Sequence, residues 1–227
     1  MSAAIVTGAS RGIGRAVALA LAARGLDVAL LARDLEALSR VADEAAAFGV
    51  RALVLACDVA REGDIAAAVA GAVEVLGAPE VVVNNAGVIR RGLVHEQPID
   101  DLRHVLDVDL VAPMLVARAA LPSMLARGRG RLVQVASVSA TLGTAGAAAY
   151  CAAKWGLVGF TKSLAEELRG TGLAAMAVLP GSVDTAMLAG SGFDPDMAPD
   201  DVARTITFLA LDAPLAMNGS AVEVFGP

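Results

Sequence analysis

The stretch "TGASRGIG", residues 7–14, follows an apolar strand pattern and leads directly into a helix pattern. Its glycines, Gly8, Gly12 and Gly14, allow a tight turn that brings backbone N–H groups close to a pyrophosphate, and the N-terminus of the following helix adds partial positive charge. The spacing is GxxxGxG and not GxGxxG, and glycine turns also occur for packing reasons. By itself, the loop favours a dinucleotide site without establishing one.

Strand and helix patterns alternate along the whole chain. Short runs that are apolar on both alternating faces are typical of strands in a parallel sheet covered by helices on each side. Seven such runs occur, at residues 3–8, 27–33, 51–59, 80–87, 131–138, 174–181 and 220–226. They predict a single domain over residues 1–227 with a Rossmann-type doubly wound α/β fold: a seven-stranded, mainly parallel sheet with helices on both faces. We expect Pro113 and Pro122 to bend or break the long helix before the fifth strand.

The composition argues against several kinds of protein. With 227 residues, 56% of them hydrophobic and 19% charged, the chain suits one compact domain. A net charge of −6 without a basic cluster argues against nucleic-acid binding. No uninterrupted apolar run reaches the roughly 18 residues that a membrane span needs. The start of the chain carries no export signal, so we expect a cytoplasmic protein without membrane contact.

Metal-binding residue types are scarce. The two cysteines, Cys57 and Cys151, lack CxxC spacing, and the two histidines, His95 and His104, leave little for a histidine-based metal site or a catalytic triad. We therefore predict no metal site and treat both cysteines as small core residues.

The stretch "YCAAK", residues 150–154, contains the only tyrosine, Tyr150, and places Lys154 one helical turn later on the same face. A phenol can give a proton to a carbonyl oxygen, but its ordinary pKa of about 10 leaves little phenolate at neutral pH. A cation about 5 Å away contributes roughly 3 kcal/mol at an effective dielectric constant of about 20, which would bring the pKa of Tyr150 to about 8. Ser137, after the fifth strand run, can hold the substrate oxygen. Such Tyr/Lys pairs are common by chance, so this pair alone is a weak indication.

Several motifs occur in a fixed order: the glycine loop, "CDV" at 57–59, "NNAG" at 84–87, Ser137 followed by Tyr150-x-x-x-Lys154, and "PGSVDT" at 180–185. Each alone could be a strand-end turn. Together they resemble the motifs of the short-chain dehydrogenase/reductase family over the whole chain. The resemblance implies hydride transfer between a nicotinamide cofactor and a carbonyl or alcohol, with Ser137, Tyr150 and Lys154 as catalytic residues.

The resemblance also implies how the cofactor is held. Asp58 would meet the adenine amino group and Val59 its ring, Asn84 would brace the sheet, and Val183 would bind the carboxamide through its backbone. The full set expected to contact the cofactor is Gly8, Ser10, Arg11, Gly12, Ile13, Gly14, Arg33, Asp58, Val59, Asn85, Ala86, Gly87, Tyr150, Lys154, Pro180, Gly181, Val183 and Thr185.

The end of the second strand run bears on the choice of cofactor. By the resemblance, Ala32 holds the position at which a carboxylate would select NAD. Arg33 can pair with a 2′-phosphate, and Arg11 adds a second cation within the glycine loop. Asp34 is expected to point away and cap the next helix. We therefore expect NADP(H), with NAD(H) as the alternative.

The chain departs from the family pattern at "VLDVDL", residues 105–110. The family usually has an asparagine that supports a water relay to the lysine, and this chain has Asp109, which therefore joins the expected catalytic set. If ionised, Asp109 offsets Lys154 and raises the pKa of Tyr150; if it offers only its backbone carbonyl, the change matters little. We expect Asp109→Asn to keep or raise activity and to shift the alkaline arm of the pH–rate profile.

The substrate is less well defined. Similarity around "GFTKSLAEELRGTG" and "RGRGRLV" suggests 3-oxoacyl-acyl-carrier-protein reductases, which would make the substrate an acyl thioester. Arg127, Arg129 and Arg169 would then meet an acidic carrier, or else they are solvated cations placed favourably at helix ends. The irregular residues 185–201 are expected to form a lid or binding loop.

Two further expectations concern assembly and the class of function. The resemblance implies a homo-oligomer, a dimer or tetramer that pairs through the fourth and fifth helices. The alternative function is a non-catalytic NADP-binding sensor or scaffold with the same fold. Such a protein would be expected to lose the serine, tyrosine or lysine, and all three are present.

Overall fold

The computed structural model describes residues 2–226. Seven strands form one sheet in the order β3-β2-β1-β4-β5-β6-β7, and every neighbouring pair is parallel. The strands are β1 (Ala3–Thr7), β2 (Asp27–Ala32), β3 (Ala52–Ala56), β4 (Val81–Asn84), β5 (Gly130–Val135), β6 (Leu173–Pro180) and β7 (Ala221–Val224). The predicted doubly wound α/β fold is confirmed.

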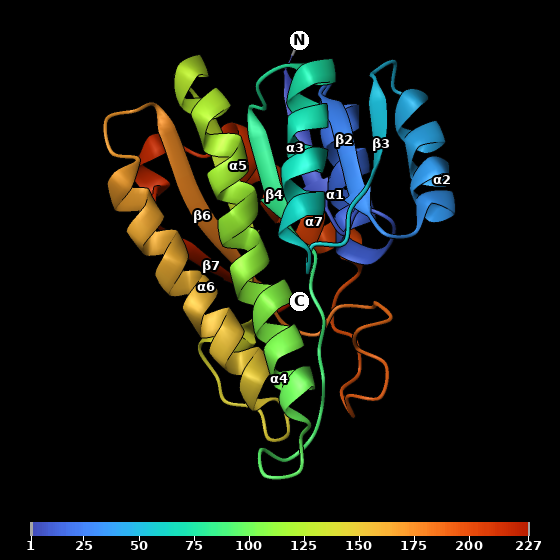
Figure 1. Ribbon diagram of the computed structural model, residues 1–227, viewed down its shortest axis with the longest axis vertical. Coiled ribbons are helices and arrows are strands. Elements are labelled where there is room, and N and C mark those ends of the chain that lie inside the picture. Colours follow the sequence, from blue (N-terminus) through green and yellow to red (C-terminus); the bar gives the residue numbers. More distant parts are fainter. Residues whose placement is uncertain (1, 227) are drawn as a thin grey trace.

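Helices cover both faces of this sheet (Figure 1). One face carries α1 (Gly12–Ala23), α2 (Leu35–Ala46) and α7 (Pro199–Thr207), and the other carries α3 (Glu62–Leu76), α5 (Ala112–Arg127) and α6 (Ala148–Glu167). Successive strand residues point to opposite faces, so both sets of positions must be apolar. In β1, Ala4 and Val6 pack in one core and Ala3 and Ile5 in the other.

The order of the strands along the sheet reverses between β1 and β4. From β1 the chain proceeds outward to β2 and β3, then returns to pair β4 with the other side of β1 and continues to β7. In such sheets a crevice forms outside the carboxyl ends of the strands where the order reverses. The glycine loop follows β1 and "NNAG" closes β4, so both predicted motifs reach this crevice.

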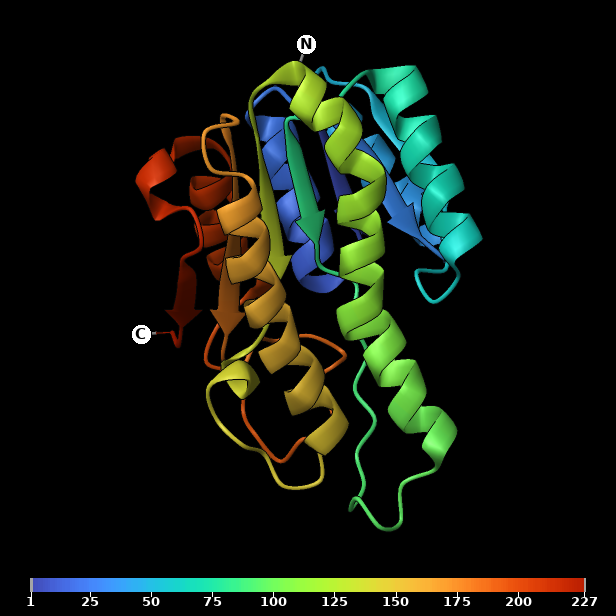
Figure 2. The ribbon, with the colours of Figure 1, turned by 60° about the vertical axis from the view of Figure 1, so that its left-hand side comes forward.

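The long helix before β5 continues past both prolines, so the predicted break is wrong. It runs from α4 (Ile99–Leu106) through a π-helical turn, η1 (Asp107–Val111), into α5 without a break (Figure 2). Pro113 lies in the first turn of α5, where a missing N–H is tolerated because the turn before it already departs from α-helical bonding. Pro122 lies inside α5, and the fully buried Ala120 and Met124 hold the helix on the sheet around it.

The same helix qualifies the expectation about membranes. Ile99–Arg127 is long and apolar enough to cross a membrane by length and composition, although charged residues and prolines interrupt it. In the structure it packs against α3, β4, β5 and α6, and 44% of its most apolar window is buried. Part of its hydrophobicity is therefore buried in the core of the fold.

The arginines considered for a carrier protein lie where α5 and α6 end, at the edge of the sheet opposite the glycine loop. Arg127 donates to Glu80 at 2.7 Å, and Arg129 lies 3.5 Å from the same carboxylate. Arg169, just after α6, pairs with Glu166 in the last turn of that helix. All three have partners within the chain, which favours the interpretation as helix-end cations.

Candidate active site

The glycine loop is shaped to leave backbone N–H groups free. Gly8 and Gly12 have φ values of 64° and 55°, which other residues rarely adopt. The N–H of Gly8 donates to the carbonyl of Leu31 at 2.8 Å, which holds the loop against the end of β2. The first turn of α1 has no side-chain cap and no acidic residue. This end of α1 therefore suits a phosphate group.

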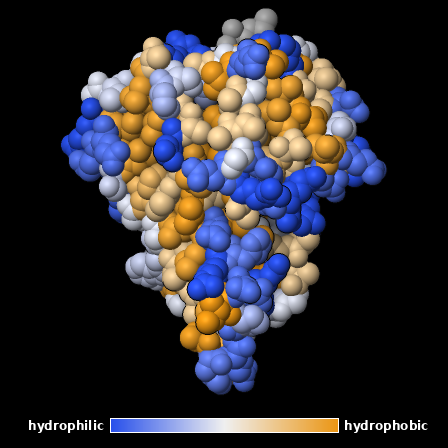
Figure 3. All heavy atoms as spheres, viewed as in Figure 1, coloured by the Kyte–Doolittle hydropathy of each residue, from blue (hydrophilic) through white to orange (hydrophobic). Residues whose placement is uncertain are grey.

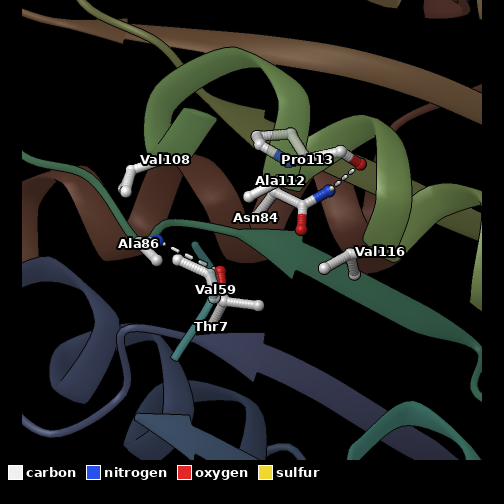
Figure 4. Close-up of a pocket in the computed structure, with 8 residues that line it drawn as sticks. All are labelled: Thr7, Val59, Asn84, Ala86, Val108, Ala112, Pro113 and Val116. Atoms are coloured by element: carbon white, nitrogen blue, oxygen red, sulfur yellow. Dashed lines mark hydrogen bonds between the residues drawn. The ribbon is translucent and has the colours of Figure 1, made fainter. Parts of the chain in front are cut away.

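Two polar side chains join the ends of β1 and β4 (Figure 4). The hydroxyl oxygen of Thr7 accepts hydrogen bonds from the N–H groups of Asn85 and Ala86, both at 3.0 Å. The amide of Asn85 donates in return to the carbonyls of Thr7 at 3.0 Å and Gly8 at 3.2 Å. Asn85 thus holds the glycine loop in place, a role that the sequence did not indicate.

Asn84 braces the structure in another direction. Its amide donates to the carbonyl of Pro113 at 3.3 Å and ties β4 to the start of α5. A narrow pocket lies at this junction, lined by Thr7, Val59, Asn84, Ala86, Val108, Ala112, Pro113 and Val116 (Figure 4). The expected bracing role is therefore divided between the two asparagines of "NNAG".

All the residues predicted to hold a cofactor lie at the carboxyl edge of the sheet or on the helix beside it. Residues 8–14 follow β1, Arg33 follows β2, Asp58 and Val59 follow β3, residues 85–87 follow β4, Pro180, Gly181, Val183 and Thr185 end or follow β6, and Tyr150 and Lys154 lie on α6. A Cβ atom at Gly12 would lie 3.2 Å from the side chain of Thr185, so the loop after β6 reaches the glycine loop.

Among the charged residues beside the crevice, Asp34 has the predicted role of helix cap. Asp34 caps α2 by accepting the N–H of Ala37 at 2.9 Å, so its carboxylate is used within the helix. Arg33 and Arg11 are exposed, and neither forms an ion pair within residues 2–226. The carboxylate of Asp58 also has a local partner, because it accepts a hydrogen bond from the N–H of Ala60 at 3.1 Å.

The loop after β6 differs slightly from the expected range. Val183 and Met197 form an isolated parallel bridge, and α7 begins at Pro199. The bridge therefore joins the two ends of the irregular segment. The segment ends at Ala198 and not at residue 201. It includes two exposed apolar side chains, Met187 and Phe193.

Ser137, Tyr150 and Lys154 meet beyond the end of β5. Ser137 begins a 3₁₀ turn, η2 (Val138–Ala140), and Tyr150 lies in the first turn of α6. The Ser137 hydroxyl accepts the N–H of Ser139 at 3.1 Å and lies near enough to Tyr150 to lower the pKa of the phenol. The ammonium of Lys154 lies 5.5 Å from the centroid of the Tyr150 ring and donates to the carbonyl of Val135 at 3.1 Å. The tyrosine and the lysine are only 8% and 3% exposed.

Asp109 enters this group directly from the π-helical turn η1. Its Oδ1 atom lies 3.0 Å from the Nζ of Lys154, and its Oδ2 accepts the N–H of Val88 at 3.0 Å. The side chain is completely buried. Of the two alternatives for Asp109, the structure therefore supports the one in which the carboxyl group itself acts on Lys154.

The pKa of Tyr150 is raised above its ordinary value, so the predicted value of about 8 is wrong for the protein alone. Burial is the largest cause, and the charge of Asp109 adds to it, whereas Lys154 and the nearby Ser137 hydroxyl lower the pKa by less. The prediction from the sequence included the lysine but neither the burial nor the contact with Asp109.

Gly87 has a role that the motif did not indicate. A Cβ atom there would lie 2.7 Å from Oδ1 of Asp109 and 3.6 Å from Nζ of Lys154. The absence of a side chain at this position therefore leaves room for the carboxylate. Only the fold brings residue 87 next to residue 109, and no sequence pattern links them.

A parallel sheet with a glycine loop at its crossover point, beside a half-buried serine and a buried tyrosine and lysine, is typical of a nucleotide-dependent oxidoreductase. Residues 2–194 match the family model described as short chain dehydrogenase. The chain belongs to the short-chain dehydrogenase/reductase family, and it is a nicotinamide-dependent oxidoreductase acting on CH–OH groups.

Individual relatives carry different names. The chain is 36% identical over 234 residues to a 3-oxoacyl-[acyl-carrier-protein] reductase of Synechocystis sp., covering 98% of this chain and 95% of the relative. It is 35% identical to a 2-(R)-hydroxypropyl-CoM dehydrogenase of Xanthobacter autotrophicus, covering 98% and 96%. The crystal structure of acetoin dehydrogenase from Salmonella typhimurium superimposes with a TM-score of 0.92 at 31% identity, covering 99% of this chain and 94% of that one.

Gly14 offers a test of the glycine loop. A Cβ atom there would lie 2.2 Å from the carbonyl oxygen of Gly8 and 2.4 Å from the Asn85 amide. Gly14→Ala should therefore displace the loop and weaken dinucleotide binding by about tenfold or more, with a loss of stability of about 1–3 kcal/mol. NADPH titration by fluorescence and thermal unfolding measure the two effects.

Gly63→Ala is the matched control, because a Cβ atom at Gly63 would have no neighbour within 4 Å and the residue lies in the first turn of α3. This variant should bind the nucleotide like the unmodified protein. Equal nucleotide affinity in both variants would contradict the assigned role of the loop.

Proposed function

We propose that the protein reduces a carbonyl compound to an alcohol with NADPH, using Tyr150 as the proton donor. The observation that carries this proposal is that the half-buried Ser137 and the buried Tyr150 and Lys154 converge on the carboxyl edge of the sheet, where the glycine loop also lies. The glycine loop and the free N-terminus of α1 fit a dinucleotide, and the bound nicotinamide would supply the hydride.

The side chains of the chain itself would orient the substrate and move the proton. Ser137 would hold the carbonyl oxygen by a hydrogen bond next to the Tyr150 hydroxyl. The carbonyl carbon gains the hydride and the oxygen gains the Tyr150 proton, so the product is a neutral alcohol and Tyr150 is left as a phenolate. Lys154 stabilises that phenolate by its charge until a solvent proton restores it.

The preference for NADP(H) rests on charge. Arg33, directly after β2, and Arg11, in the glycine loop, are exposed cations, and the Asp34 carboxylate is used at the N-terminus of α2. An arginine pairs well with a 2′-phosphate, whereas a free carboxylate there would repel it. NAD(H) remains the alternative cofactor.

For the substrate, we propose a 3-oxoacyl thioester or a related ketone. Support comes from the 3-oxoacyl-[acyl-carrier-protein] reductases among the relatives and from exposed apolar side chains, such as Leu142 and Phe193, on the loops beyond the sheet edge. We also propose a cytoplasmic location, to which the free thiols Cys57 and Cys151 are suited. No observation favours the non-catalytic sensor, since the serine, tyrosine and lysine are assembled together.

Tyr150→Phe tests the proton donor. The substitution removes one hydroxyl from a buried ring, so folding and NADPH binding should be retained while turnover of ketones falls by about 100-fold or more. NADPH oxidation with a panel of ketones and 3-oxoacyl thioesters measures the turnover. Undiminished turnover in this variant would refute the mechanism.

Arg33→Ala tests the cofactor preference. Loss of a charge-assisted hydrogen bond to a 2′-phosphate should weaken NADPH binding by about tenfold or more and leave NADH binding unchanged. Arg40→Ala, on the exposed side of α2, is the control and should change neither. Equal changes for NADPH and NADH would rule out a 2′-phosphate contact.

We propose that the protein forms a homo-oligomer through α5 and α6. Val111 next to α5, Leu125 on α5 and Trp155 on α6 are 41%, 45% and 55% exposed. Figure 3 shows apolar surface over α5 and beside it, and a groove of about 390 Å³ lies between α3 and α5. Apolar surface of this kind on adjacent helices is typical of a subunit contact.

Trp155→Glu should therefore lower the molar mass measured by light scattering after size-exclusion chromatography, because it places a charge in the proposed contact. Phe48→Glu is the control, since Phe48 is 52% exposed and follows α2, away from α5 and α6. A monomeric unmodified protein, or one whose mass is unaffected by Trp155→Glu, would contradict the proposal.

A further inference from the structure

The buried carboxylate of Asp109 distinguishes this site from one that contains only serine, tyrosine and lysine. It comes from η1, the π-helical turn that joins α4 and α5. Single π-helical turns within long helices are frequent at functional sites, because they redirect the side chains of one turn. Here the turn packs against α6, and Asp109 reaches the ammonium of Lys154.

Both oxygens of Asp109 face donors. Oδ1 lies 3.0 Å from Lys154 Nζ and Oδ2 accepts the N–H of Val88 at 3.0 Å. Burial raises the pKa of Asp109, whereas Lys154 and the N–H of Val88 oppose that effect. The 3.0 Å contact between Oδ1 and the ammonium is that of a buried ion pair, in which Asp109 helps to raise the pKa of Lys154.

The ion pair changes the charge beside Tyr150. Lys154 alone would present a full positive charge near the phenol, which favours the phenolate. With Asp109 at 3.0 Å, the two side chains together carry no net charge. Gly87 makes the contact sterically possible, since a Cβ atom there would lie 2.7 Å from the carboxylate.

The other groups around these three side chains do not replace the missing positive charge. Cys151 on α6 lies near Tyr150, and the negative charge of its thiolate would raise the pKa of the phenol. The charge of a protonated His104 on α4 would lower the pKa of the Asp109 carboxyl group. The loop after β4 contributes the Val88 N–H, and β5 and η2 contribute the Val135 carbonyl and the Ser137 hydroxyl, none of which titrates in this range.

We infer that Asp109 is a positioning residue that neutralises Lys154 and so keeps Tyr150 protonated to higher pH than the lysine alone would allow. The inference rests on the proposed function of Tyr150 as proton donor. In that role a protonated Tyr150 supplies the proton for carbonyl reduction, and a phenolate is needed for alcohol oxidation. Asp109 therefore extends reduction toward alkaline pH and restricts oxidation to higher pH.

The single tyrosine makes a direct test possible, because the ultraviolet absorption of phenolate reports Tyr150 alone. In Asp109→Asn, the phenolate should appear about one pH unit or more lower than in the unmodified protein. The alkaline arm of reduction and the rising arm of oxidation should move down with it, while affinity for NADPH stays the same.

Asp107→Asn is the matched control. Asp107 belongs to the same π-helical turn but is exposed, so its substitution should leave the Tyr150 titration unchanged. Asp109→Ser should give the same downward shift as Asp109→Asn, and it serves if the asparagine variant does not fold. An unchanged or higher titration of Tyr150 in folded Asp109 variants would overturn the inference.

The titration also separates this inference from the proposed function, because it requires no turnover. A downward shift of the phenolate in a protein that reduces no ketone or 3-oxoacyl thioester would refute the proposed function and support the charge effect. Turnover that depends on Tyr150, combined with an identical titration in Asp109→Asn, would support the function and refute the role of Asp109.

Discussion

The functional part of this protein depends on the junction between the carboxyl ends of β1 and β4. Two hydrogen bonds join Thr7 and Asn85 there, and two more run from Asn85 to Gly8 and from Ala86 to Thr7. Together they hold the glycine loop against "NNAG". The chain order of the sheet makes these two strands neighbours, although their residues are nearly eighty positions apart.

The second constraint is electrostatic. Tyr150, Lys154 and Asp109 are all buried, so each charge depends on its neighbours for stabilisation. The ammonium of Lys154 pairs with the Asp109 carboxylate and donates a hydrogen bond to the Val135 carbonyl. It also lies beside the phenol ring of Tyr150. A site of this kind can change its proton affinity through one substitution, because solvent screens the charges poorly.

Much of the fold could be predicted because the patterns are strong. Both faces of each buried strand must be apolar, and glycine, asparagine and proline mark the strand ends, so the seven apolar runs coincide with the seven strands. Local propensity does not show that the long helix continues past its prolines, because packing around Ala120 and Met124 and the π-helical turn decide this. The pKa of Tyr150 was misjudged for a similar reason, since burial and the Asp109 contact both depend on the tertiary structure.

The sequence by itself determined the alternation of strands and helices, the glycine loop, the spacing of Tyr150 and Lys154 on one helical face, and the use of Asp34 as a cap. These are local properties, set by side chains within a few residues of one another. Only the tertiary structure decided that Asn85 bonds to Gly8, that Gly87 makes room for Asp109, and that Asp109 pairs with Lys154. Those contacts join residues from different strands and helices, and their energies depend on burial that arises only when the sheet and its helices pack together.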